Sequence, residues 1–174
     1  MALFINALGF QSAWWLCVAG VGHGLELPAL AYGVVLMGLH LFFAPRPRQE
    51  LQLAAVAVAI GVWVDTGLQM AGVISFYGWA LGPLSPFWLW LLWALFAMTL
   101  NASLSFLQSQ PMWLSAVAGL VFGPLTYVAG AELGAAGLVV TPWHMGVLAV
   151  AWLMALPLLV AIAKRLSVSS KGLT

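Results

Sequence analysis

The sequence predicts an all-α integral membrane protein, a bundle of six transmembrane helices with both termini in the cytoplasm. Only 5% of its 174 residues are charged and 64% are hydrophobic, whereas about a quarter of the residues of a soluble domain are charged. Four acidic and five basic residues cannot cover a water-soluble surface. At about 20 apolar residues per crossing, six helices use the whole chain. Residues 1–174 are therefore predicted to form a single transmembrane domain.

The spans are predicted to be helices because the apolar runs lack the alternation of a transmembrane β-barrel. The run from Leu89 to Leu100, for example, carries apolar residues on every side. Proline lies at the start of several runs, where the amide hydrogen that it lacks would be unpaired in any case. No basic segment precedes the first run, which is expected of a retained helix. The predicted spans are residues 3–21, 27–44, 51–74, 86–107, 111–130 and 142–163.

The distribution of basic residues predicts the orientation of the bundle. Arg46 and Arg48 lie between the second and third spans, and Lys164, Arg165 and Lys171 follow the sixth. The connections after the first, third and fifth spans contain no Lys or Arg. Because Lys and Arg are enriched in cytoplasmic connections, both termini are expected on the cytoplasmic side. An odd number of spans would place basic residues on both sides of the membrane.

Asp65 is the most deeply placed ionisable residue of the predicted bundle, about two thirds of the way along the third span. Burying a carboxylate near the bilayer centre costs about 2.5–3.5 kcal/mol on insertion scales. Gly61, Gln69 and Gly72 recur with Asp65 at helical spacing, which predicts a face turned towards neighbouring helices. Two interpretations are open: a proton or ligand site, and a structural hydrogen bond between helices.

Other polar and aromatic residues extend this candidate site. Asn101 continues a stripe with Trp90 and Trp93 on the fourth span, although core packing with an interhelical amide bond also explains this pattern. The outer half of the bundle adds carboxylate and imidazole groups, which serve acid–base chemistry in many enzymes. Their spacing matches no metal site, and we predict no catalytic residue, metal or cofactor. The candidate ligand-binding residues are Asp65, Gln69, Trp90, Trp93, Asn101, Tyr127, Glu132 and His144.

Four segments together resemble a known protein family. They are Pro45 to Arg48, Gly61 to Asp65, Trp93 to Asn101 and Gly123 to Gly130. This combination is similar to a family of small bacterial inner-membrane proteins catalogued as a domain of unknown function. The resemblance covers nearly the whole chain and implies a multi-pass protein of the bacterial inner (plasma) membrane, with gene neighbours that modify fatty acids. It implies no particular activity or site.

Three functions remain open on the sequence. The favoured one is the binding or handling of a lipid or hydrophobic small molecule. Membrane lipids would be its partners, and the protein would act alone or with another membrane subunit in transport or lipid modification. The second function is an intramembrane lipid-modifying enzyme that uses Asp65, Glu132 or His144. The third is a structural scaffold for membrane enzymes. No nucleic-acid partner is expected, because the basic residues form two short flanks.

The predicted orientation can be tested with a C-terminal fusion to a reporter enzyme that is active only outside the cytoplasm. We expect no reporter activity, because the basic flanks hold the C terminus in the cytoplasm. A fusion to a reporter that is active only inside the cytoplasm provides the control and should be active. The opposite pattern would refute the orientation.

Overall fold

The computed structural model describes residues 2–169 and is almost entirely helical over that range. Two-residue strands β1 and β2 pair antiparallel, with Ser75 opposite Gly137. A short 3-10 helix, η1, covers Ser105–Ser109. The strands are β1 (Ser75–Phe76) and β2 (Ala136–Gly137), and the α-helices are α1 (Ala2–Gly22), α2 (Glu26–Phe43), α3 (Pro47–Met70), α4 (Phe87–Leu100), α5 (Met112–Glu132) and α6 (Pro142–Ser169).

Five of the six predicted spans correspond to helices that are long and apolar enough to cross a membrane. Within the described residues these are α1, α2, α3, α5 and α6. The fourth predicted span, residues 86–107, is shorter in the structure. Helix α4 has 14 residues, or about 21 Å at 1.5 Å per residue, which is less than the hydrocarbon thickness of about 30 Å.

Local polar chemistry explains why α4 ends at Leu100. Beyond it the chain reads Asn-Ala-Ser-Leu-Ser, whose polar side chains compete with the helical hydrogen-bond ladder. The carbonyl oxygen of Thr99 accepts from the backbone amides of Ala102 and Leu104 instead, at 3.0 and 2.7 Å. The chain then continues as a turn and η1, so the last third of the predicted span is not regular α-helix.

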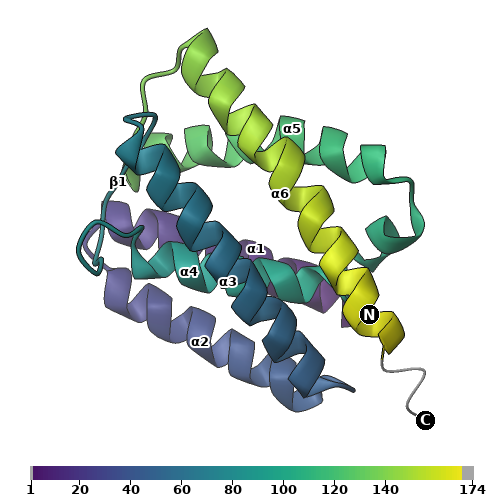
Figure 1. Ribbon diagram of the computed structural model, residues 1–174. Helices are drawn as coiled ribbons and strands as arrows, with labels where there is room; N and C mark the ends of the chain where they lie inside the picture. Colours follow the sequence, from purple (N-terminus) through teal and green to yellow (C-terminus); the bar gives the residue numbers. More distant parts are fainter. Residues whose placement is uncertain (1, 170–174) are drawn as a thin grey trace.

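Helix α4 lies at the centre of the bundle (Figure 1). Eleven of its 14 residues are buried, including Trp93 and Leu95, and it packs against α1, α2, α3 and α6. A helix that is apolar on all sides requires apolar surroundings. The outer helices instead expose large apolar side chains, such as Phe42 and Trp63, each 81% accessible. The outer surface is therefore suited to lipid, while α4 is enclosed by protein.

The six helices run alternately between two ends of the molecule (Figure 1). At one end, the hydroxyl of Ser103 donates to Asn6 Oδ1 at 2.7 Å and joins the start of α1 to the turn after α4. We call this the basic end. The opposite end carries β1 and β2, and we call it the strand end. The described basic residues Arg46, Arg48, Lys164 and Arg165 all belong to the basic end, and Lys171 lies outside the described residues.

The connection between α3 and α4 is tied to the bundle at the strand end. Glu26, at the start of α2, is buried, and both of its carboxylate oxygens accept from the backbone amide of Trp79, at 3.0 and 2.9 Å. The backbone amide of Ser85 donates to Thr66 Oγ1 at 3.0 Å. Together with the β1–β2 pair, these bonds order a connection whose sequence is hardly polar.

Small residues allow the helices to approach closely at two places. A Cβ atom on Gly61 of α3 would overlap the indole ring of Trp93. A Cβ atom on Gly119 of α5 would overlap the carbonyl oxygen of Trp152 in α6. Glycine at these positions brings α3 against α4 and α5 against α6.

Replacing Gly119 with alanine should lower the stability of the bundle. The added methyl group meets backbone, which cannot rotate away, and overpacking of this kind costs about 1–3 kcal/mol. The matched control is Gly146→Ala in α6, where nothing lies within 4 Å of an added Cβ and alanine favours the helix by up to about 1 kcal/mol. Thermal unfolding of both variants in mild detergent should show a lower midpoint for Gly119→Ala alone.

Candidate functional site

A fully buried carboxylate joins three helices in the interior of the bundle. Asp65 of α3 has no accessible surface. Its Oδ2 atom accepts a hydrogen bond from the indole Nε1 of Trp93 in α4 at 2.7 Å. Its Oδ1 atom accepts from the hydroxyl of Tyr127 in α5 at 2.5 Å. Both oxygens therefore have a short hydrogen bond to a side chain from another helix.

Aromatic packing holds the two donors in place. Gly61, one turn before Asp65, leaves room for the Trp93 ring against α3. The Trp93 ring stacks on Trp152 of α6, with a centroid separation of 4.9 Å and an interplanar angle of 11°. Tyr127 lies against Phe76 at a centroid distance of 5.9 Å. Asp65 forms no ion pair within residues 2–169, so its surroundings are aromatic rings and two hydrogen-bond donors.

Trp93 and Tyr127, the two hydrogen-bond donors to Asp65, form part of the wall of a large apolar cleft. The cleft has a volume of about 600 Å³ and is lined by α1 and α4 on one side and by α5 and α6 on the other. None of the described residues that line it is charged. Eleven of the 27 lining residues are aromatic, among them Phe10, Trp14, Phe96, Trp93, Tyr127 and Trp152.

The cleft opens at the side of the bundle, between α1 and α5. Most of its exposed lining residues lie on these two helices, where Trp15 is 50% accessible and Phe122 is 66% accessible, and Phe106 of η1 is also exposed. Gln11 and Thr126, also exposed, place polar groups at this rim. Trp93, only 4% accessible, belongs to the deep wall. The opening therefore faces the side of the bundle that is suited to lipid.

Three of the eight residues proposed from the sequence come together around the cleft. These are Asp65, Trp93 and Tyr127, of which Trp93 and Tyr127 line the cleft while Asp65 lies behind them. Their grouping agrees with the inward face predicted from Gly61, Asp65 and Gln69. The prediction that Gly72 shares this face is wrong, because α3 ends at Met70 and Gly72 is exposed in the turn that follows.

The remaining candidates lie elsewhere and hold local structure. Gln69 accepts from the backbone amide of Phe76 at 3.3 Å, and Trp90 donates to the hydroxyl of Ser85 at 3.1 Å. Both bonds fix the connection between α3 and α4. At the strand end Glu132 is exposed at the last position of α5, and His144 Nδ1 lies 2.7 Å from the carbonyl oxygen of Val139. None of these four residues lines the cleft.

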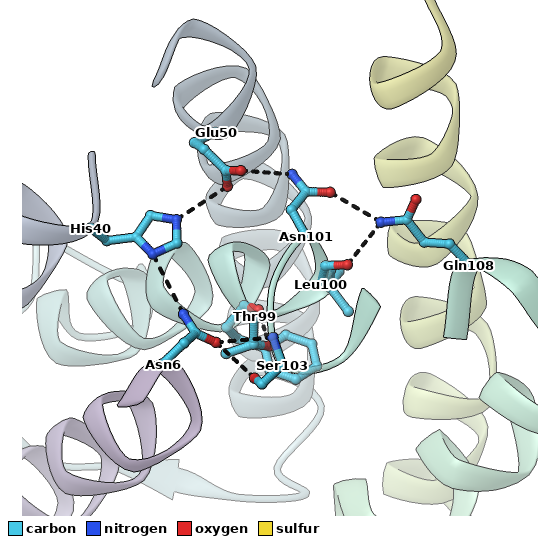
Figure 2. A network of polar contacts seen from close by, with 9 residues as sticks. Asn6, His40, Glu50, Thr99, Leu100, Asn101, Ser103 and Gln108 are labelled. Atoms are coloured by element: carbon cyan, nitrogen blue, oxygen red, sulfur yellow. Dashed lines mark hydrogen bonds and ion pairs between the residues drawn. The ribbon is translucent and has the colours of Figure 1, made fainter. Parts of the chain in front are cut away.

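Asn101, the last of the candidates, belongs to a polar network at the basic end (Figure 2). Its amide nitrogen donates to Glu50 Oε1 at 3.2 Å, and its amide oxygen accepts from Gln108 Nε2 at 3.1 Å. Gln108 also donates to the carbonyl oxygen of Leu100 at 2.8 Å. Asn101 thus closes the end of α4 against α3 and η1, and it does not line the cleft.

The network continues through His40 to the first helix (Figure 2). His40 Nε2 lies 3.5 Å from Glu50 Oε2, and its other ring nitrogen lies 3.4 Å from the amide nitrogen of Asn6. Asn6 in turn accepts from Ser103. The network therefore ties α1, α2, α3 and the turn after α4 together, and its position outside the cleft favours a role in holding these ends.

Trp152 is the residue that sequence reasoning missed. It stacks on Trp93, lines the cleft and packs against Gly119 and Gly123 of α5. The signal was the four-residue spacing of these two glycines, which marks a groove on α5 for a large side chain from a neighbouring helix. The identity of that side chain depends on how α5 and α6 pack, which the spacing does not specify.

Replacing Tyr127 with phenylalanine should destabilise the bundle by about 1–3 kcal/mol, because a buried carboxylate oxygen loses its hydrogen-bond donor. The control is Tyr32→Phe, which removes a hydroxyl contact with Ser12 at the outer surface of the bundle and should cost much less, because Ser12 keeps its bond to the carbonyl oxygen of Gly9. Unfolding midpoints in detergent provide the measurement. Equal losses of stability in the two variants would show that the hydrogen bond to Asp65 contributes no more to stability than the contact between Tyr32 and Ser12.

Comparison with known proteins identifies the family. A family model described as "Protein of unknown function (DUF2878)" matches residues 3–158. No curated protein and no solved structure matches the chain. The match covers α2, α3, α4 and α5 completely, α1 from its second residue and most of α6, and it includes Asp65, Trp93, Tyr127 and Trp152. It confirms the resemblance to a domain of unknown function, and the chain therefore belongs to the DUF2878 family.

Proposed function

We propose that the protein crosses a bacterial inner membrane six times, with both termini in the cytoplasm, and binds a lipid or another hydrophobic molecule in the lateral cleft. The observation that carries this proposal is the cleft itself, an uncharged volume of about 600 Å³ with an aromatic lining and a side opening. Pockets of this size and character are typical of small-molecule sites.

The six-span topology is supported by the alternating direction of the helices and by the described basic residues at one end (Figure 1). Helix α4 is shorter than a usual span, but it runs between the same two ends as its neighbours. Protein surrounds α4, and the turn at residues 101–105 that follows it is half-buried. Irregular backbone is tolerated at membrane depth where protein covers it.

The chemistry of the cleft favours an uncharged, apolar occupant. A charged group would lose its hydration without meeting a counter-charge, since no described lining residue carries one. Aromatic rings offer large rigid surfaces to acyl, isoprenoid or ring structures. The rim residues Gln11 and Thr126 can hydrogen-bond a weakly polar end of such a molecule near the opening.

Asp65 supports binding by fixing the deep wall of the cleft. The polar atoms of Trp93 and Tyr127 are directed to the carboxylate, so these side chains present ring surface to the cleft. A wall that is already ordered lowers the entropic cost of binding. Asp65 therefore acts as a positioning residue. Since Glu132 and His144 do not line the cleft, enzymatic chemistry through them is not part of the proposal.

The proposal can be tested by photo-crosslinking with an uncharged long-chain fatty alcohol that carries a diazirine in its alkyl chain. Lipid surrounding the protein can label the outer helices and the exposed Phe87 at the start of α4, but it reaches the middle of α4 only through the cleft. In wild-type membranes we expect crosslinks on the α4 segment that contains Leu92, Trp93 and Phe96. Labelling confined to the outer helices would contradict the proposal.

A blocking variant adds a matched control. Thr126→Trp places a large ring at the rim of the cleft and should reduce α4 labelling about tenfold, the effect of a binding loss near 1.4 kcal/mol. Val121→Trp introduces the same ring at an exposed α5 position that does not line the cleft, and α4 labelling should stay at the wild-type level. Equal labelling in both variants would show that the cleft is not the route.

A further inference from the structure

A second cavity lies at the basic end, between η1 and the C-terminal part of α6. Its volume is about 570 Å³. Two adjacent cationic residues, Lys164 and Arg165, and two amides, Gln108 and Gln110, belong to its lining. With the exception of Leu107, the described residues that line it differ from those that line the lateral cleft. We propose that this cavity binds the headgroup of an anionic phospholipid from the cytoplasmic leaflet.

Within residues 2–169, the acidic side chains leave these two cations without a counter-charge. The chain has four acidic residues. Glu26 accepts from Trp79, Glu50 pairs with His40 and Asn101, and Asp65 accepts from Trp93 and Tyr127. The fourth, Glu132, ends α5 at the strand end. Within residues 2–169 neither Lys164 nor Arg165 forms an ion pair, so the described part of the chain leaves both cations available to a bound anion.

The cavity also has the geometry of a headgroup site. Gln108 is fixed by its bonds to Leu100 and Asn101, and it accepts from Ser167 of α6 at 3.4 Å, which holds η1 beside α6. Gln110 is exposed at the rim. An arginine guanidinium binds phosphate through two parallel hydrogen bonds, and lysine and amide groups add single donors. These hydrogen-bond donors suit a headgroup in which a phosphate is linked to further groups that accept hydrogen bonds.

The apolar part of the lining distinguishes a lipid from a free phosphate. Val160 is buried, and Ala161 is half-buried beside it on α6, while Met112 exposes 58% of its surface at the start of α5. The apolar lining, with Met112 open to the surroundings, gives the start of an acyl chain a path from the phosphate site. Basic pockets between helices on the cytoplasmic side are a known form of anionic lipid site.

The experiment uses the full-length protein purified in mild detergent. Native mass spectrometry would compare titrations with dioleoyl phosphatidylglycerol and dioleoyl phosphatidylcholine, which have the same acyl chains. We expect the anionic lipid to bind about tenfold more tightly, because only its headgroup carries a net negative charge for Lys164 and Arg165. Equal affinity for the two lipids would overturn the proposal.

Paired variants locate the site. Arg165→Gln should weaken phosphatidylglycerol binding about fivefold, and Arg48→Gln, which removes the same charge elsewhere at the basic end, should not. Ala161→Trp fills the cavity without changing charge and should weaken binding, whereas Leu158→Trp adds the same ring at an exposed α6 position outside the cavity. An equal loss for Arg48→Gln and Arg165→Gln would indicate general charge attraction and refute the site.

A competition separates the lipid from soluble phosphate. Glycerophosphoglycerol carries the same phosphodiester headgroup without acyl chains. If it displaces phosphatidylglycerol at equal concentration, the site recognises free phosphate and the lipid assignment is wrong. Failure to displace supports the lipid. These measurements do not require an occupant in the lateral cleft. The variant Thr126→Trp, which blocks that cleft, should therefore leave phosphatidylglycerol binding intact.

Discussion

The hydrogen bonds of one buried carboxylate determine how the two halves of this bundle meet. Asp65 on α3 accepts from Trp93 on α4 and from Tyr127 on α5. It therefore links the group of helices α1, α2, α3 and α4 to the α5–α6 pair. The Trp93–Trp152 stack supports the same junction from α6. A carboxylate in apolar surroundings is stable only when its oxygens are hydrogen-bonded. The helices that satisfy Asp65 therefore also fix the shape of the cleft beside it.

Part of this arrangement could be predicted from local patterns. The spacing of Gly61, Asp65 and Gln69 identified the inward face of α3, and uniform hydropathy identified five helices of spanning length. The early end of α4 was not predicted, because the polar residues after Leu100 also fit a continuing amphipathic helix. Trp152 and the cleft depend on contacts between distant segments. A hydropathy pattern describes which side of a helix is apolar, but not which neighbouring side chain fills that side.

Most of the acidic side chains of the chain connect separate segments of the fold. Glu26 orders the connection at the strand end, Asp65 joins the helices in the interior, and Glu50 anchors the network at the basic end. Three of the four acidic residues thus act as hydrogen-bond acceptors between segments that are distant in sequence. In a bundle that is almost wholly apolar, such hydrogen bonds provide the directional constraints that uniform apolar packing lacks.

The walls of the lateral cleft come from opposite ends of the chain. Residues of α1, such as Phe10 and Trp14, face residues of α5 and α6, such as Tyr127 and Trp152. During synthesis the first wall is made long before the second, and the cavity does not exist until α6 has docked. A nascent or truncated chain thus lacks the finished cleft, and any molecule bound there would bridge the earliest and latest helices and stabilise their association.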